Sequence, residues 1–226
     1  MKKNTYTLIQ VCAIGLFAAV CILTPPVISY PLLILLLVRV MIFLRPAKGA
    51  GIQSFQNSGQ ALIVIDMQEA MCGRNGIYPE KEKFVEKVNQ IIQDARRQNQ
   101  KIVYICQEFH RLDFAFCFLA FGGRLLQGTI GASLCPDLKI AGDAVFVKHE
   151  QDAFTSRRFC GYLNDNRINA VTVVGLDASA CVYKTSLGAV SRGFCVTVIQ
   201  EGIIGKNTAV KKRALQKLSK AGVSIR

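Results

Sequence analysis

The apolar residues of this chain are concentrated in one long N-terminal segment. Between Tyr6 and Leu44, the only strongly polar side chains besides hydroxyl groups are Gln10 and Arg39. The segment is longer than the apolar core of a secretory signal peptide, which has about 7–15 residues. A helix that crosses a bilayer needs about 20 apolar residues. The pattern therefore predicts transmembrane helices ahead of the rest of the chain.

Two prolines, Pro25 and Pro26, divide this segment into halves. Residues 7–24 and 27–44 can form two helices joined by a turn, although one span followed by an interfacial helix also fits, as does a buried hairpin of a soluble protein. Basic residues flank both ends of the segment: Lys2, Lys3, Arg45 and Lys48. Basic flanks favour the cytoplasmic side of a membrane. We therefore predict that residues 1–47 are a hairpin anchor in the inner or plasma membrane, that lipid is a partner, and that the rest of the chain faces the cytoplasm.

The remainder of the chain alternates short apolar runs with helical patterns. Residues 48–60, rich in glycine, serine and amides, are predicted to be a linker, and residues 61–226 a single domain. Apolar strands are predicted at residues 61–66, 101–106, 143–148, 170–175 and 194–199, and helices at about 79–98, 156–166, 179–192 and 205–222; the stretch from 107 to 142 is predicted to be irregular. This order is typical of an α/β fold: a three-layer αβα sandwich with a mainly parallel, doubly wound sheet.

Charge and cysteine content narrow the functional classes. The formal net charge is +13, and part of the excess lies in the last predicted helix. That helix can present a basic face to solvent or to anionic lipid, but no recognition motif accompanies it, so we expect no nucleic-acid partner. The nine cysteines show no paired CxxC spacing. They are typical of reduced, buried thiols rather than of a disulfide framework or a zinc site.

Three reactive side chains lie at, or just after, the ends of different predicted strands: Asp66, Lys148 and Cys181. Ligands bind at this edge of open parallel sheets, so the three could converge on one crevice. Cys181 begins a predicted helix, and the helix dipole and a nearby ammonium group are expected to lower the pKa of its thiol. Asp66 could then accept the thiol proton and return it to a leaving amine. Taken singly, a residue of each of these types is more often structural, as a helix cap, a surface charge or core packing.

Three sequence blocks resemble the signatures of the isochorismatase-like cysteine hydrolases: "ALIVIDMQ", "VFVKHEQDAF" and "VVGLDASACVYKTSLGAVSRGF". This family includes nicotinamidases and ureidoacrylate and N-carbamoylsarcosine amidohydrolases. The similarity runs from about Ala61 to Ile204. It implies a catalytic triad of Asp66, Lys148 and Cys181, a cis peptide between Leu176 and Asp177, and an oxyanion hole made by the backbone amides of Asp177 and Cys181.

The candidate substrate pocket is less sharply defined by the sequence. The resemblance implies a pocket role for Phe154, and we add Gln68, from the first block, and Phe116. Phe116 belongs to a phenylalanine cluster that could line the pocket, form a lid, or pack on the sheet or against the membrane.

The resemblance to nicotinamidases also implies a metal site, made of an acidic residue and several histidines after the second strand. Only Glu108 and His110 match that pattern here, and His149 is the one other histidine of the chain. His149 is adjacent to Lys148 on a strand and should point to the opposite face, in a packing role. Because two ligands make a poor site, we predict no metal and no other cofactor.

The sequence therefore predicts a membrane-anchored cysteine hydrolase. Its substrate would be a small molecule with an amide, ureide or carbamoyl C–N bond, cleaved through a Cys181 thioester. Two alternatives remain open: a catalytically idle, membrane-tethered binding or scaffold protein of the same fold, and a non-hydrolytic thiolate enzyme such as an isonitrile hydratase. A homo-oligomer is compatible with the sequence, and the substrate itself is not indicated.

Overall fold

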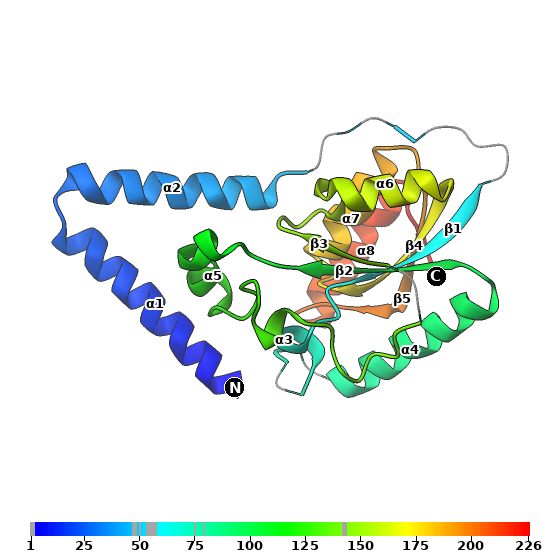
Figure 1. The fold of residues 1–226 in the computed structure, drawn as a ribbon, viewed down its shortest axis with the longest axis horizontal. Coiled ribbons are helices and arrows are strands. Elements are labelled where there is room, and N and C mark those ends of the chain that lie inside the picture. Colours follow the sequence, from blue (N-terminus) through cyan, green and yellow to red (C-terminus); the bar gives the residue numbers. More distant parts are fainter. Residues whose placement is uncertain are drawn as a thin grey trace.

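The centre of the molecule is a six-stranded parallel sheet (Figure 1). The computed structural model describes residues 3–46, 49, 51–52, 58–74, 76–78, 80–141 and 144–226. The strands run in the order β3-β2-β1-β4-β5-β6, and they are β1 (Gly59–Ile65), β2 (Lys101–Gln107), β3 (Ala144–Lys148), β4 (Ile168–Leu176), β5 (Cys195–Ile204) and β6 (Ser224–Ile225). The strand order reverses between β1 and β4, and ligands bind outside the carboxyl ends of the strands at such a point.

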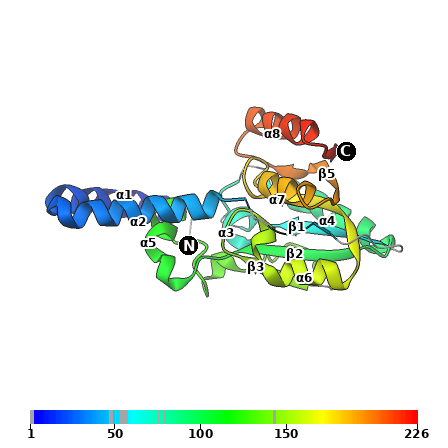
Figure 2. The same ribbon diagram turned by 90° about the horizontal axis from the view of Figure 1, so that it is seen from above.

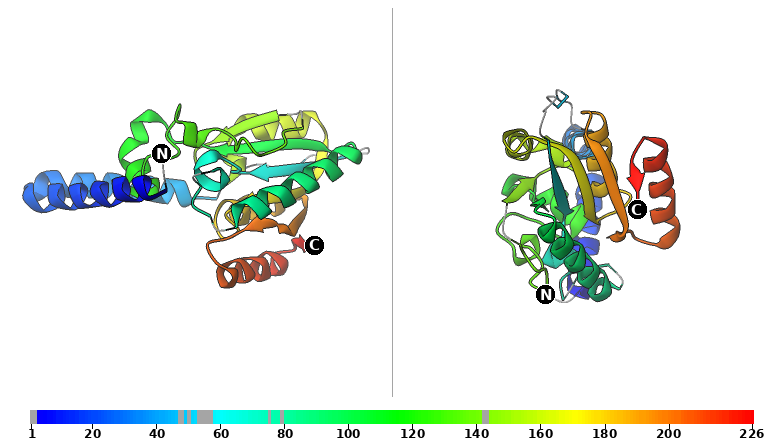
Figure 3. Two further views of the ribbon diagram at one scale, coloured as in Figure 1. Left: turned by 90° about the horizontal axis from the view of Figure 1, so that it is seen from below. Right: turned by 90° about the vertical axis from the view of Figure 1, so that its right-hand side faces the viewer.

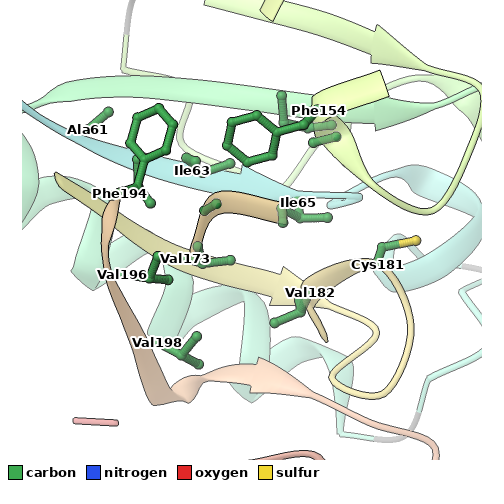
Figure 4. Close-up of a cluster of buried hydrophobic side chains, with 14 of the residues drawn as sticks. Ala61, Ile63, Ile65, Phe154, Val173, Cys181, Val182, Phe194, Val196 and Val198 are labelled. Atoms are coloured by element: carbon green, nitrogen blue, oxygen red, sulfur yellow. The ribbon is translucent and has the colours of Figure 1, made fainter. Parts of the chain in front are cut away.

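Helices cover both faces of the sheet (Figure 2, Figure 3). One face is covered by α4 (Lys81–Arg97); the other is covered by α6 (Arg157–Asp165), α7 (Cys181–Val190) and α8 (Thr208–Lys220). A hydrophobic core lies on each side of the sheet, and strand β1 contributes to both. Leu62 and Val64 pack on the α4 side, while Ile63 and Ile65 pack on the side of α6, α7 and α8. This alternation explains the unbroken apolar run of β1. Figure 4 shows the core on the side of α6, α7 and α8. The predicted three-layer αβα sandwich is confirmed.

One sequence prediction is wrong: the stretch from 107 to 142 is not wholly irregular. It contains α5 (Phe114–Phe121) and short 3-10 turns at Arg111–Asp113 and Ile130–Ala132. Two further short elements, α3 (Glu69–Cys72) and a 3-10 turn at Ala153–Thr155, were also not predicted. Helix α5 is apolar on nearly all sides, so it lacks the 3.6-residue alternation that marks an amphipathic helix in a sequence.

The N-terminal segment forms a helical hairpin that projects from the sheet domain (Figure 1, Figure 2). Its arms are α1 (Lys3–Leu23) and α2 (Pro26–Leu44), and Pro26 lies in the first turn of α2, where proline is favoured. By length and composition, α2 could cross a membrane, whereas the apolar part of α1, Thr7–Leu23, falls short of that length.

The base of the hairpin is packed into the sheet domain. Phe43 of α2 is only 6% exposed, and its ring contacts the rings of Phe109, Phe116 and Phe121 at centroid distances of 5.4 to 5.9 Å. Of the predicted linker, only residues 49, 51–52 and 58–60 are described. Within it, the N–H of Ile52 donates to the carbonyl of Arg192 at 2.8 Å. The hairpin and the domain therefore share one packed core.

Candidate active site

Four polar side chains are carried to the carboxyl edge of the sheet by four different elements. Asp66 directly follows β1, Gln107 ends β2, Lys148 ends β3, and Cys181 begins α7 after β4. The backbone of Asp66 is left-handed, with φ of 54°, a conformation that aspartate tolerates better than most residues. Asp66, Lys148 and Cys181 lie together at the edge of the sheet where we expected them.

The ammonium group of Lys148 is the centre of this cluster. Its Nζ lies 3.0 Å from Asp66 Oδ2, 3.3 Å from Cys181 Sγ and 2.7 Å from Gln107 Oε1. All three predicted catalytic residues are buried, with 3% of Asp66, 1% of Lys148 and 8% of Cys181 exposed. The sulfur of Cys181 points away from the apolar cluster beneath it (Figure 4). A thiol, a carboxylate and an ammonium group thus share one site that is largely closed to water.

Burial controls the protonation of the site. It raises the pKa of Asp66 above the usual range, and the charge of Lys148 offsets only part of that effect. Burial also lowers the pKa of Lys148, but Asp66 and Cys181 outweigh it and the net shift is upward. Lys148 is therefore a cation, and Asp66 is a stronger base than an exposed aspartate.

The expected lowering of the Cys181 pKa is wrong. Burial, and then the neighbouring carboxylate of Asp66, raise the pKa of the thiol, and the opposing effect of Lys148 is smaller. The sequence places Cys181 at a helix start near a lysine but does not show that the sulfur is withdrawn from water. The thiol is therefore harder to ionise than that of an exposed cysteine, and a base would have to remove its proton for the sulfur to act as a nucleophile.

This arrangement predicts slow alkylation of Cys181. At neutral pH we expect iodoacetamide to modify the exposed Cys195 first, because only a thiolate reacts, and the rate at Cys181 to rise with pH. Asp66→Asn should speed modification of Cys181 several-fold, since it removes a charge that raises the thiol pKa. Mass spectrometry of the cysteine peptides over time measures both rates. Slower alkylation of Cys181 in Asp66→Asn would show that the carboxylate favours the thiolate.

Two backbone amides near Cys181 are available to bind an oxyanion. In the turn before α7 and the first turn of that helix, four N–H groups donate to acceptors in the protein: those of Ala178 to Ile204 O, Ser179 to Asp177 Oδ1, and Ala180 and Val182 to Asp177 O. Among the hydrogen bonds of the described residues, the N–H groups of Asp177 and Cys181 have no acceptor. These are the two amides that the resemblance implies for an oxyanion hole. The peptide bond between Leu176 and Asp177 is cis.

The side chain of Asp177 is held by neighbours within the protein. Its Oδ2 accepts a hydrogen bond from the Tyr78 hydroxyl at 2.9 Å, and its Oδ1 accepts from the backbone N–H and hydroxyl of Ser179 at 2.7 and 2.6 Å. This carboxylate therefore fixes the turn that leads into Cys181.

The three residues predicted to line a substrate pocket all contact other parts of the protein. The Gln68 amide donates to the carbonyls of Gln107 and Ala132 and accepts from the Gln107 N–H. Phe154 points toward Phe194 rather than toward Cys181 (Figure 4). Phe116 packs against Phe43 at the base of the hairpin. These contacts hold the three side chains in place within the protein. Their role in substrate binding stays a prediction.

The donor set for a metal is incomplete. Among the described residues, no group of three histidine, cysteine, aspartate or glutamate side chains is placed to hold an ion. The rings of His110 and His149 are stacked with centroids 3.8 Å apart, and His149 Nδ1 lies 2.8 Å from the backbone oxygen of Glu108. With no third donor beside them among the described residues, Glu108, His110 and His149 do not fit the metal site that the resemblance in sequence implied.

Sequence reasoning missed two residues of the site. Gln107 accepts a hydrogen bond from Lys148 and is 2% exposed; its signal was available, because it is a polar residue at the end of an apolar strand, as Asp66 is. Tyr78 binds Asp177 from a loop about 100 positions earlier in the chain, and no local pattern marks it.

Comparison with known proteins gives consistent matches to the sheet domain. A family model described as "Isochorismatase domain" matches residues 60–226. The nicotinamidase of Escherichia coli (strain K12) is 26% identical over an alignment of 200 residues that covers 74% of this chain and 93% of that protein.

Solved structures agree with the sequence matches. A pyrazinamidase of Pyrococcus horikoshii, crystallised in complex with zinc, has a TM-score of 0.65 and 26% identity over 74% of this chain and 98% of its own. An N-carbamoylsarcosine amidase from Thermoplasma acidophilum has a TM-score of 0.64 and 26% identity, and the match covers 74% of this chain and 95% of that protein. The family match begins after the N-terminal hairpin, so α1 and α2 lie outside it.

Proposed function

The chain belongs to the isochorismatase family, and from this premise we propose that it is a membrane-attached amidohydrolase with Cys181 as its nucleophile. The family supports hydrolysis of amides, since the relatives include a nicotinamidase and an N-carbamoylsarcosine amidase. The observation that carries the proposal is the contact of one buried ammonium group, that of Lys148, with both Asp66 and Cys181. Its substrate would carry an amide, ureide or carbamoyl C–N bond.

In the first step, Asp66 accepts the proton of the Cys181 thiol, and the sulfur attacks the carbonyl carbon of the substrate. The raised pKa of Asp66 suits it to this task, and Lys148, 3.3 Å from the sulfur, stabilises the negative charge on it. The C–N bond then breaks as Asp66 gives its proton to the leaving nitrogen. Ammonia or an amine departs, and an acyl thioester remains on Cys181.

In the second step, water attacks the thioester while Asp66 accepts one of its protons. The C–S bond breaks and the sulfur takes the proton back, so the acid leaves and the thiol is restored. Both steps pass through a tetrahedral oxyanion. The N–H groups of Asp177 and Cys181, which have no acceptor among the described hydrogen bonds, are the proposed donors to it.

Membrane attachment is proposed from the apolar hairpin. The length and composition of α2 support it, and basic residues on both flanks favour a catalytic domain on the cytoplasmic side. Full-length protein should remain in the membrane fraction after high-salt and alkaline washes. Its release by either wash would reject the attachment and leave the proposed chemistry untouched.

The proposed chemistry predicts release of ammonia or amine from a panel of small amides. Full-length protein in detergent should turn over at least one compound among pyridine carboxamides, N-carbamoyl amino acids and ureides, and Cys181→Ala should turn over none. Ammonia release, with product mass, is the measurement. If a folded protein turned over no compound of the panel, the result would count against hydrolysis. Conversion of an added isonitrile to the formamide, which is one water heavier, would indicate hydration.

A further inference from the structure

We infer that the α1–α2 hairpin is a re-entrant anchor, which enters the bilayer from the side of the catalytic domain and leaves it on that same side. Its turn, at Thr24 and Pro25, would then lie within the hydrocarbon. The inference rests on the membrane attachment proposed above and goes beyond it, because a hairpin of two spans would place this turn in water on the far side.

The outer part of the hairpin has a surface suited to lipid. Ile22 and Leu23, at the end of α1, are 80% and 82% exposed. Between Pro26 and Leu35, α2 exposes apolar side chains around most of its circumference. No charged residue lies between Lys3 and Arg39. A helix that is apolar all round is stable when it is buried in protein or in a membrane, and the sheet domain does not cover this part (Figure 3).

The inner part of the hairpin is fastened to the domain and is not free to enter lipid. Arg39 donates two hydrogen bonds to Asp113, at 2.8 and 3.0 Å, and its guanidinium lies over the ring of Phe116 at 5.0 Å. Phe43, one turn further along α2, is buried among aromatic rings. On the other arm, Gln10 of α1 donates to backbone carbonyls at the end of α5, at 2.9 and 3.0 Å.

The free arms are too short to cross a bilayer. Residues 11–23 of α1 span about 20 Å and residues 26–35 of α2 about 15 Å, at roughly 1.5 Å per residue. The hydrocarbon core is about 30 Å thick. For the tip to reach the far side, the ion pair of Arg39 with Asp113 and the polar edge of the sheet would have to enter the core, where charged groups are costly. The fastened base therefore sets the depth of insertion.

The turn pairs several of its backbone groups within the hairpin. Thr24 donates both its backbone N–H and its hydroxyl to the carbonyl of Val20, at 3.0 and 2.7 Å. Pro25 and Pro26 have no N–H to satisfy. The carbonyl of Pro25 accepts from the N–H groups of Ile28 and Ser29, at 2.9 and 3.1 Å. Among the described hydrogen bonds, the N–H of Val27 and the carbonyls of Ile22 and Leu23 have no partner. Because each unpaired backbone group costs several kcal/mol in hydrocarbon, these few groups add to the cost of inserting the turn, which the exposed apolar side chains of the two arms must offset.

At the base, α5 adds apolar side chains that suit the membrane surface. Leu112, just before α5, is 95% exposed and Phe114 is 58% exposed, and the helix lies beside both arms of the hairpin. Exposed apolar residues next to charged ones are typical of a segment held at the lipid interface. The proposed membrane-binding surface therefore consists of the two free arms of the hairpin and of α5 at their base.

Labelling of a cysteine at the tip tests the inference. Full-length protein in sealed vesicles, with the catalytic domain outside, carries either Leu23→Cys at the tip or Gln98→Cys on the exposed end of α4. Cys12, Cys21, Cys160 and Cys195, the native thiols that are not buried, are replaced by alanine in both. A charged, membrane-impermeant maleimide is applied to intact vesicles, to vesicles opened by protein pores, and to detergent-dissolved protein. We expect labelling of Leu23→Cys to be at least about tenfold faster in detergent than in either kind of vesicle, while Gln98→Cys reacts equally in all three.

Each other result rejects the re-entrant anchor for a different reason. Rapid labelling of Leu23→Cys once pores are opened would place the tip on the far side, with attachment retained. Labelling in intact vesicles as fast as that of Gln98→Cys would place the tip in water beside the domain. Protection that persists in detergent would indicate a protein contact, such as a second copy of the hairpin. Absence of the protein from the vesicle fraction would reject attachment as well.

Discussion

Replacing Cys181 by serine should abolish turnover and leave the fold intact. The site raises the pKa even of the thiol, and a hydroxyl is far harder to ionise, so Asp66 could not generate a usable nucleophile. We expect kcat to fall by a factor of about 10³ or more, as for other nucleophile replacements. Serine is close to cysteine in size, so the packing around this buried side chain should persist. The measurements are kcat on a substrate from the amide panel and the far-UV circular dichroism spectrum.

The chain supplies its own control for this substitution. Cys160 is half-buried and donates a hydrogen bond to the carbonyl of Phe154 at 3.4 Å, a contact that serine can keep. Cys160→Ser should retain most of the activity. If Cys181→Ser kept a tenth or more of the wild-type kcat, the sulfur would not be the nucleophile, and Asp66 would have to activate water directly.

The sheet was predictable because its strands are buried on both faces. The run "ALIVI" of β1 alternates between two cores, so each of its positions is apolar, and the strand stands out from the polar segments around it. Helix α4 could be found from the spacing of Phe84, Val88 and Ile92, all of which are buried. Helix α5 could not be found in this way. Its residues pack against the hairpin, and exposed positions such as Phe114 are apolar as well, so no polar face interrupts them.

The candidate site was predictable in position but not in the pKa of its thiol. Parallel strands bring their carboxyl ends to one edge, so Asp66, Lys148 and the start of α7 could be placed there from the order of elements alone. The pKa of Cys181 depends on how much water reaches the sulfur, and no local pattern reports that burial. Likewise, Arg39 could be seen as a lone charge in an apolar helix, but its partner Asp113 lies 74 positions away.

The second large effect concerns Phe43, which joins the hairpin to the domain. Phe43→Ala should lower the free energy of unfolding by about 3–5 kcal/mol, the usual cost of removing a buried phenylalanine side chain. The ring is 6% exposed and contacts three other rings, so a cavity would open between α2, α5 and the strand edge. Urea denaturation in detergent, followed by circular dichroism because the chain has no tryptophan, gives the change.

Met41 provides the matched control for Phe43. It lies on the same helix, two positions earlier, but is 70% exposed. Met41→Ala should therefore change the free energy of unfolding in detergent by no more than about 0.5 kcal/mol. Equal and small effects at both positions would mean that α2 is a loose tether whose contacts add no stability. A large effect at Phe43 alone would show that a segment outside the family match is part of the folded core of the sheet domain. In the proposed re-entrant anchor, the same contacts would also limit the depth of insertion.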